Sequence, residues 1–313
     1  MARIVVVGSF NMDLVVRLPV IPKPGETLLG GVFATYPGGK GSNQAVAAAR
    51  LGGEVTMIGR VGADAFGDQL LAAARAEGID TRFVGVDPHT ATGVALIQVD
   101  AQGQNSIAVA SGANFALTAA DVADAFARLD RVDMLVMPLE TPLETIVIAA
   151  ELARKAGARV VLNPAPAQHL SPELLTTVDV LVPNEHEAAF MTGIEIQSRR
   201  QDARRAAEQL LRSGPDSVII TMGSEGALIA ELAEPAPIFT QAAAFAVDAI
   251  DTTAAGDAFV GALAVMLGEG QSLTEAARFA SAAAAIAVTR AGAQPSLPTR
   301  GEVEAFLRLR TSA

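Results

Sequence analysis

The sequence predicts an α/β fold: a central, mostly parallel sheet with helices on both faces, plus a small antiparallel β lid. Short β-branched runs recur along the 313 residues, and helix-like stretches lie between them. Such alternation is typical of a parallel sheet whose crossover connections are helices. Half of the residues are hydrophobic, which is enough to bury a large core. We therefore expect one α/β domain over residues 1–313, with the lid formed by about 13–36 and 90–111.

The expected strands are short apolar runs that each end at a turn residue. They are Ile4–Val7, Val55–Ile58, Met134–Met137, Arg159–Leu162, Val180–Val182 and Val218–Thr221. Continuous apolar runs are typical of strands that are buried on both faces. The helices expected between and after them are Asn43–Leu51, Phe66–Glu77, Ala119–Leu129, Thr141–Ala156 and Asp202–Arg212, followed by an Ala-rich helical region from Gly256 onward.

Two segments depart from this alternation, because they look extended and contain no helical pattern. The first is residues 13–33. In the second, Gly93–Val99 and Gln104–Ala110 flank a loop that contains Gly103, which predicts a hairpin. We expect the two segments to form one lid beside the main sheet. Two ordinary surface hairpins are the alternative.

Composition excludes several classes of function. With 23 basic and 34 acidic residues the net charge is −11, which repels nucleic acid and anionic membranes, so we expect neither as a partner. The absence of cysteine excludes disulfides, thiolate metal sites and thiol nucleophiles. The N-terminal apolar run is too short for a secretory signal, and no apolar run reaches membrane-spanning length. We therefore expect a cytoplasmic protein.

Polar side chains follow the expected strands, at the edge where ligands bind in open parallel sheets. In chain order they are Asn11, Asp13, Glu140, Asn163, Asn184, Glu187, Thr221, Gly223 and Ser224. Strand ends often pass into polar loops, so each position taken alone has an ordinary structural explanation. Their convergence on one crevice predicts a ligand site.

A glycine-rich motif precedes the first expected helix: Gly38-Gly39-Lys40-Gly41-Ser42-Asn43-Gln44-Ala45. It is not a P-loop, because Gly41 follows the Gly-Lys pair and Ala34 stands where the first glycine would lie. Paired glycines let a backbone approach a ligand closely, and the Asn43 side chain offers a donor and an acceptor that suit sugar hydroxyls. A glycine turn with Asn43 as the helix N-cap is the alternative.

A second motif, Asp251-Thr252-Thr253-Ala254-Ala255-Gly256-Asp257, runs into a helix that we expect from Ala258. Small residues before a helix leave backbone N–H groups free, and with the helix dipole these form an anion site. Such a site stabilises charge on a γ-phosphate during phosphoryl transfer without cationic side chains. Asp257 would then face the accepting hydroxyl. In the alternative, Asp257 is only an N-cap or first-turn acid.

Both motifs resemble the signatures of the ribokinase family of carbohydrate kinases. The first signature combines Gly38, Gly39, Asn43, Ala45, Gly52 and Gly62, and the second is the stretch Asp251–Ala264. Similarity to the family also runs nearly end to end. It includes Gly8–Asp13, Gly39–Ala49, Thr92–Leu96, Asn163–Ala167, Pro183–Ala188 and Ala285–Ser296.

The resemblance implies a catalytic base and a set of sugar contacts. Asp257 is implied as the base that deprotonates the sugar hydroxyl. The implied sugar contacts are Asn11, Asp13, Gly39, Lys40, Asn43 and Glu140. The implied anion hole is the backbone of Ala254, Ala255, Gly256 and Asp257.

The resemblance also implies ATP, Mg2+ and K+ as cofactors. Asn184 and Glu187 resemble the family's motif for Mg2+ and phosphate, acting through water, which suits an ion that keeps much of its hydration. The further nucleotide contacts implied are Thr221, Gly223, Ser224, Gly226, Gly256 and Ser281. The implied monovalent-cation loop uses mostly carbonyl oxygens and comprises Asp251, Thr253, Ala287, Arg290, Gly292 and Ser296. For Arg290, a surface ion pair is the alternative.

Two positions depart from the family pattern. Glu225 lies in the implied nucleotide loop, where a basic or neutral residue is more usual, and it would repel phosphate unless it points to solvent. Ser281 stands where a larger polar residue often flanks adenine. Both positions leave the assignment of Asp257 intact.

The implied reaction transfers a phosphoryl group from ATP to the 5-hydroxyl of D-ribose. Kinases for deoxyribose, fructose or a nucleoside such as adenosine are the alternatives. The lid offers Phe33 and Tyr36 but few other aromatics to stack a base, which favours ribose over a nucleoside. A non-catalytic sugar sensor is disfavoured because Asp257 and Gly256 are both present. The resemblance also implies a homodimer formed through the lid.

Overall fold

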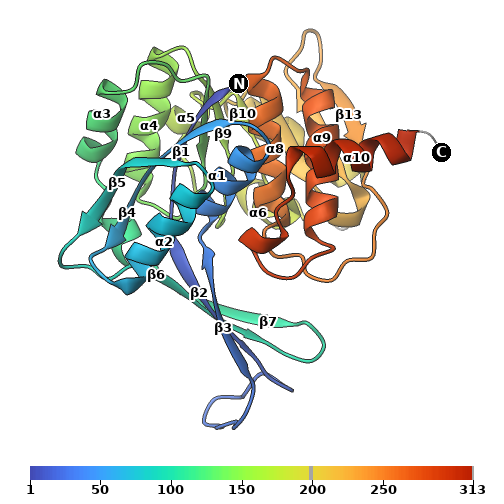
Figure 1. Ribbon diagram of the computed structural model, residues 1–313. Coiled ribbons are helices and arrows are strands. Elements are labelled where there is room, and N and C mark those ends of the chain that lie inside the picture. Colours follow the sequence, from blue (N-terminus) through green and yellow to red (C-terminus); the bar gives the residue numbers. More distant parts are fainter. Residues whose placement is uncertain (197–199, 312–313) are drawn as a thin grey trace.

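Figure 1 shows the computed structural model, which describes residues 1–196 and 200–311. A nine-stranded sheet forms its centre. In spatial order the strands are β13 (Ile238–Ala242), β12 (Ala227–Glu231), β11 (Ser217–Thr221), β10 (Val180–Leu181), β9 (Arg159–Leu162), β8 (Met134–Met137), β1 (Arg3–Val7), β4 (Glu54–Gly62) and β5 (Asp80–Asp87). From β11 to β5 all neighbours run parallel, whereas β12 and β13 add an antiparallel edge. The predicted fold class is confirmed.

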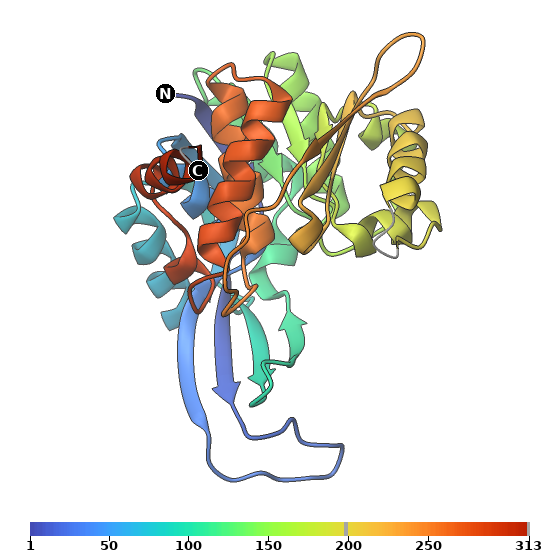
Figure 2. The same ribbon diagram turned by 90° about the vertical axis from the view of Figure 1, so that its right-hand side faces the viewer.

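Helices cover both faces of this sheet (Figures 1 and 2). On one face lie α1 (Lys40–Arg50), α2 (Ala65–Ala76), α8 (Ala255–Gly268), α9 (Leu273–Ala287) and α10 (Arg300–Thr311). On the other lie α3 (Ala119–Ala127), α4 (Leu143–Lys155), α5 (Pro172–Leu175), α6 (Glu185–Thr192) and α7 (Arg200–Arg212). Alternate residues of each strand enter the two cores: Ile4 and Val6 face one, and Val5 and Val7 face the other. This explains the continuous apolar runs in the sequence.

The two extended segments meet in one small sheet, rather than in two separate hairpins. Its order is β3 (Val32–Gly38), β2 (Asn11–Arg17), β6 (Gly93–Val99) and β7 (Asn105–Ala110), and it projects away from the large sheet (Figure 2). The outer pairs are antiparallel, as predicted, but β2 and β6 run parallel. The small sheet is therefore mixed. The reason is that β2 follows β1 and β6 follows β5, so both strands leave the same edge of the large sheet in the same direction.

The chain order creates a crevice at the carboxyl end of β1. From β1 the chain passes to β4 on one side and later returns to β8 on the other. Connections at such a switch point leave in opposite directions, which opens a ligand-binding gap. Short 3-10 helices η1 (Gly112–Ala116), η2 (Gly223–Glu225) and η3 (Gln294–Ser296) lie in the surrounding loops. Among the described residues, no helix combines the length and apolarity needed to cross a membrane.

Two helices begin earlier than predicted. Helix α1 starts at Lys40, three residues before Asn43, and its N-cap is Gly39 with φ 89°. Helix α8 starts at Ala255 rather than Ala258, with Ala254 as its N-cap. The interpretations of Asn43 and Asp257 as N-caps are therefore wrong. Both residues lie within the first turns of their helices, where their side chains are free to meet across the interface of α1 and α8.

Candidate active site

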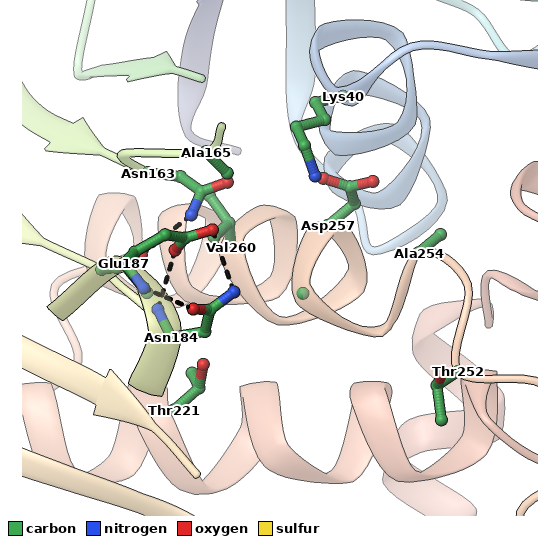
Figure 3. Close-up of a pocket in the computed structure, with 12 residues that line it drawn as sticks. Lys40, Asn163, Ala165, Asn184, Glu187, Thr221, Thr252, Ala254, Asp257 and Val260 are labelled. Carbon is green, nitrogen blue, oxygen red and sulfur yellow. Dashed lines mark hydrogen bonds between the residues drawn. The ribbon is translucent and has the colours of Figure 1, made fainter. Parts of the chain in front are cut away.

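A cavity of about 180 Å3 opens at the carboxyl edge of the large sheet (Figure 3). Of the sequence-predicted site residues, it is lined by Lys40, Asn184, Glu187, Thr221, Ala254, Gly256 and Asp257. It is also lined by Asn163, Ala165, Val182, Thr252 and Val260. The predicted phosphate, nucleotide and base positions thus share one space, and the residues that line it come from five separate parts of the chain.

The carboxylate of Asp257 is held at both oxygens by helix α1. Asn43 Nδ2 donates to Asp257 Oδ2 at 3.0 Å, and Gln44 Nε2 donates to Asp257 Oδ1 at 3.0 Å. Asp257 is 6% exposed, so these amides replace most of its water. A carboxylate fixed in this way keeps further lone pairs for a ligand hydroxyl.

The electrostatic surroundings of Asp257 make it a stronger proton acceptor than an exposed aspartate. Burial raises the pKa of Asp257, and the nearby Glu140 carboxylate adds to that rise. The Lys40 ammonium and the hydrogen bonds from Gln44 and Asn43 oppose it, but the net pKa is raised. Figure 3 shows the Lys40 side chain extending toward Asp257. A buried carboxylate of raised basicity is what a general base requires.

Lys40 is surrounded by carboxylates. Burial by itself lowers the pKa of Lys40, but the charges of Asp257, Glu140 and Glu187 outweigh burial and raise it. Glu140 in turn accepts hydrogen bonds from Ser9 Oγ and, at 2.9 Å, from Lys40 N. Glu140 therefore ties the loop after β8 to the start of α1, across the switch point.

Asp13 is a second buried carboxylate among the residues predicted to contact a sugar. It is 8% exposed, and burial together with the charges of Glu140 and Asp257 raises its pKa to about 7. A Cβ atom at Gly38 would lie 2.3 Å from Asp13 Oδ2, so only glycine leaves room for this carboxylate. At Gly39, φ is 89° and a Cβ would lie 2.7 Å from Asn11 N. The paired glycines thus make room for the chain's own polar groups.

Asn11 is oriented by a residue that the sequence analysis did not single out. Asn114 Nδ2 donates to Asn11 Oδ1 at 2.8 Å and to Phe10 O at 3.0 Å. Asn114 Oδ1 accepts from Phe10 N at 2.8 Å. Since the Asn11 oxygen is occupied, its Nδ2 is the group left to donate to a ligand. Asn114 lies on η1 and is 1% exposed, so this arrangement is shielded from water.

The N-terminus of α8 is an open cradle of backbone. Ala254 adopts φ 58°, a left-handed conformation that favours glycine, and no side chain caps the helix. A Cβ atom at Gly256 would meet nothing within 4 Å, although Gly256 lines the cavity. Ala255 N donates to Thr252 O at 3.3 Å, whereas the N–H groups of Gly256 and Asp257 have no partner among the described residues. Gly256 and Asp257 both line the cavity, so their free N–H groups give this helix end the geometry of an anion site.

Asn184 and Glu187 are joined in a capping box at the start of α6. Glu187 N donates to Asn184 Oδ1, Asn184 N donates to Glu187 Oε2, and Asn184 Nδ2 donates to Glu187 Oε1. Burial raises the pKa of Glu187, and the opposing contributions of Asn184 and Lys40 do not cancel it. Within residues 1–196 and 200–311, no cluster of three or more acidic or histidine side chains could hold a metal directly. Both oxygens of Glu187 are engaged, which fits contact with a hydrated ion.

The predicted nucleotide positions are more dispersed. Thr221 lines the cavity and forms a β-bridge with Asn184, whereas Gly223, Ser224 and Glu225 are exposed on η2. The Glu225 side chain is exposed to solvent, which is the arrangement in which this acid would not repel phosphate. Gly226 has φ 88°, and a Cβ there would lie 2.1 Å from Ala242 O, so its glycine is required by packing. Ser281 is buried on α9 and is not among the cavity-lining residues.

The predicted cation loop is partly assembled. Asp251 Oδ1 accepts from Thr253 N and Oγ1, and Asp251 Oδ2 accepts from Gly292 N at 2.9 Å. Burial opposes these hydrogen bonds, but together they hold the pKa of Asp251 below its usual range. Ala287 O accepts from Arg290 N at 3.0 Å, and Ser296 is fully buried on η3.

The side chain of Arg290 does not belong to this loop. It pairs with Glu302 of α10 at 2.5 Å, so the surface ion pair considered as an alternative is present. Only the backbone of Arg290 is left for a cation, as for Ala287.

Three further residues at the site have no place among the positions predicted from the sequence. Gln44 bridges Asp257 and Asn163, Asn114 orients Asn11, and Ser9 joins Glu140 to Gly41 N. Gln44 lies inside the glycine-rich motif, so its position was a usable signal. Nothing local marks the roles of Asn114 and Ser9, because the partners in these contacts lie 32 to 131 residues away along the chain and only the fold brings them together.

Comparisons with known proteins agree with this geometry. The sequence profile of pfkB family carbohydrate kinases matches residues 1–300. Ribokinase from Haemophilus influenzae is 46% identical and covers 96% of this chain and 97% of its own length. Ribokinase from Bacillus subtilis is 41% identical, and the match covers 98% of this chain and 100% of that protein. The solved structure of Arabidopsis thaliana ribokinase complexed with ribose and ATP is 32% identical in sequence, with a TM-score of 0.88. The match covers 98% of this chain and 99% of that one. With this match over nearly its whole length, the chain belongs to the pfkB family of carbohydrate kinases.

Proposed function

We propose that the chain is an ATP-dependent ribokinase that converts ATP and D-ribose to ADP and D-ribose 5-phosphate. The observation that carries this proposal is the pairing of a clamped, buried Asp257 with the open N-terminus of α8 in one cavity. The first supplies a base and the second an anion site, which are the two parts that phosphoryl transfer needs. Similarity to proteins named ribokinase, one of them solved with ribose and ATP, supports ribose as the acceptor.

The sugar would bind among buried polar groups on the small-sheet side of the cavity. The residues proposed to contact it are Asn11, Asp13, Gly39, Lys40, Asn43 and Glu140. Asn43 Oδ1 is buried and accepts no hydrogen bond from the described residues. A buried acceptor without a donor is costly, and a sugar hydroxyl would supply one. Asp13 would accept hydrogen bonds from sugar hydroxyls, so a sugar that lacks one of them would leave it poorly paired.

In the proposed reaction, Asp257 takes the proton of the ribose 5-hydroxyl as its oxygen attacks the γ-phosphorus of ATP. The bond between the γ-phosphorus and the bridging oxygen breaks, and ADP leaves with that electron pair. The backbone N–H groups from Ala254 to Asp257 would stabilise the charge on the transferred group. Most of the rate gain would come from positioning and electrostatics, because this chemistry needs no covalent intermediate.

Mg2+ and K+ are proposed as activators. Asn184 and Glu187 would hold Mg2+ through its water ligands, and bound Mg2+ would neutralise phosphate charge. ATP would contact Thr221, Gly223, Ser224, Gly226 and Gly256, with Ser281 near the adenine. K+ would bind carbonyl oxygens of the loop that Asp251 ties to Gly292, next to the anion site. We expect K+ to raise the rate, and equal rates in K+ and choline buffers would contradict this assignment.

A homodimer through the small sheet is also proposed. Pairing in register places Asp13, Ala95 and Val109 on one face of this sheet. The same face continues outward to Ile97 and Ile107, and Ile107 is 53% exposed. An apolar sheet face of this kind is typically covered by another surface, here a second copy. Light scattering on Ile107→Asp should show a lower mass than the parent chain, and a parent chain that is already monomeric would contradict the proposal.

A substrate panel tests the proposed function. ADP release is measured with ATP, Mg2+ and K+ and one of four acceptors: D-ribose, deoxyribose, fructose or adenosine. We expect D-ribose to give the largest kcat/KM. If another acceptor exceeds ribose by about tenfold, a difference that one well-placed hydrogen bond can produce, ribose is the wrong substrate. If calorimetry shows sugar binding while no acceptor releases ADP, the chain is a sensor rather than a kinase.

A further inference from the structure

Gln44 is a fully buried side chain of α1 to which the proposed reaction gives no part. Its Nε2 donates to Asp257 Oδ1 at 3.0 Å and to Asn163 Oδ1 at 3.1 Å. We propose that Gln44 is a positioning residue, which fixes the carboxylate of Asp257 for proton transfer and ties it to the strand ends on the phosphate side of the cavity. The inference rests on the proposed role of Asp257 as the base.

The clamp on Asp257 needs two donors. Asn43 holds Oδ2 and Gln44 holds Oδ1, so each carboxylate oxygen accepts one amide hydrogen. Rotation of the carboxylate about its Cβ–Cγ bond would break both hydrogen bonds. With Asn43 alone, the carboxylate could swing about a single contact. Proton transfer depends steeply on such orientation, because the reacting atoms must be aligned at close range.

The bond to Asn163 connects this clamp to the opposite wall of the cavity. Asn163 follows β9, and its Nδ2 donates to Val182 O at 2.9 Å, just after β10. Both residues line the cavity, and Asn184 lies two residues beyond Val182. A continuous chain of hydrogen bonds therefore runs from the base on α8, through Gln44, to the segment that leads into the Asn184–Glu187 capping box.

The orientation of the Gln44 amide is fixed by its partners. Val182 O is a backbone acceptor, so Asn163 must present Nδ2 to it and Oδ1 to Gln44. Gln44 then faces two oxygens and must present Nε2 to both. The result is that Gln44 Oε1 is buried and accepts no hydrogen bond from the described residues. An unpaired buried oxygen is costly, so packing alone does not account for glutamine here.

The charges around Asp257 make the two amide donors important for keeping its carboxylate ionised. The carboxylates of Asp13, Glu140 and Glu187 approach it from β2, the loop after β8 and α6. Among the described residues, Lys40 of α1 is the cation that opposes them. Burial raises the pKa of Asp257, and the hydrogen bonds from Gln44 and Asn43 lower it. Loss of the Gln44 donor removes one of the groups that favour the ionised base.

Gln44→Met tests the inference because methionine keeps the unbranched shape and removes both donors. Ser42→Ala is the matched control, since it removes a buried hydrogen bond of the same helix turn, Gln294 Nε2 to Ser42 Oγ at 2.9 Å, that does not reach Asp257. With ATP and D-ribose, we expect kcat of Gln44→Met to fall by about tenfold to a hundredfold. The acid limb of kcat/KM should move to higher pH, while Ser42→Ala keeps the wild-type profile.

An unmoved acid limb in Gln44→Met, or an equal loss of kcat in Ser42→Ala, would overturn the inference. If Gln44→Met does not fold, Gln44→Leu also removes both donors without adding a charge beside Asp257, and the same alkaline shift is required of it. The wild-type rate with D-ribose is measured first. An inactive wild type contradicts the proposed function itself, whereas an active wild type with an equally active Gln44→Met contradicts only the role of Gln44.

Discussion

The two sides of the cavity are built in different ways. On the side proposed for the sugar, the buried carboxylate of Asp257 is held by Asn43 and Gln44 of α1, and the buried carboxylate of Asp13 lies near enough to feel its charge. On the side proposed for the nucleotide, the α8 N-terminus presents backbone groups and η2 presents the exposed residues Gly223 and Ser224. The first side is organised before any ligand arrives, at the cost of burying charge. The second relies on open space and free N–H groups, so its groups gain their partners from the ligand.

Asp257→Asn should have the largest effect, because it removes the proposed base from the organised side. We expect kcat with D-ribose to fall by about a thousandfold. Sugar binding by calorimetry should persist, since asparagine still fits between Asn43 and Gln44. Because burial raises the pKa of Asp257, the neutral side chain should also unfold at an equal or higher temperature.

Asp68→Asn is the control for this variant. Asp68 is likewise an acid of a first helical turn, on α2, but it is exposed. It should leave kcat unchanged. If Asp257→Asn retained near-normal turnover, Asp257 would not be the base.

Gly256→Ala probes the open side. A Cβ atom at this position meets nothing within 4 Å, so the variant should fold normally. The same methyl group would occupy the space where the phosphate is proposed to bind, and we expect kcat/KM for ATP to fall by about a hundredfold. Gly301→Ala on α10 also gains an unobstructed methyl group and should keep full activity. Equal activity of the two variants would contradict an anion site at α8.

Asn114→Ala should act on sugar binding alone. It removes the donor that holds Asn11 Oδ1, so the Asn11 amide would lose its fixed orientation. We expect KM for D-ribose to rise by about tenfold, with KM for ATP unchanged. Asn105→Ala, an exposed asparagine on β7, is the control. A similar rise in both KM values would show a general loss of structure instead of a local effect on Asn11.

Asp13→Asn should alter how stability depends on pH. The folded pKa of about 7 lies above the ordinary value of 3.8, so the stabilising contribution of protonated Asp13 is complete below pH 3.8 and is lost as the pH rises through 7. Relative to the parent chain, the variant should gain melting temperature at pH 8 but little at pH 4. The full difference is on the order of a few kcal/mol. An identical difference at both pH values would show that Asp13 does not titrate in this range.

Much of the fold follows from the apolar patterning of the sequence. Runs such as Met134–Met137 and Arg159–Leu162 match β8 and β9 residue for residue, because strands buried on both faces cannot be mistaken for amphipathic helices. Strands β5, β12 and β13 were not predicted from the sequence. These are edge or near-edge strands, and β5 and β13 mix polar and apolar residues because one side meets solvent.

The site was predictable where one motif carries the chemistry, and not where the fold brings distant residues together. The stretch before Asp257 indicated an anion site, and the structure leaves that helix end open. The start of α1 was misplaced by three residues, because a glycine with positive φ can serve as the N-cap without a side-chain signal. As a result two interpretations of Asn43 stayed open, a sugar contact and an N-cap. The clamp that Asn43 and Gln44 form on Asp257, 213 to 214 residues away, could not be inferred.

The central claim is that Asp257 and the α8 N-terminus transfer phosphate to the 5-hydroxyl of ribose. Phosphorus NMR of the product formed from ATP and D-ribose tests it most directly. Phosphate on C5 couples to two protons, so the account predicts a phosphomonoester triplet that grows as ADP forms and is absent with Asp257→Asn. A doublet from phosphate on a carbon with one proton, or ADP formation without any new phosphomonoester, would contradict it.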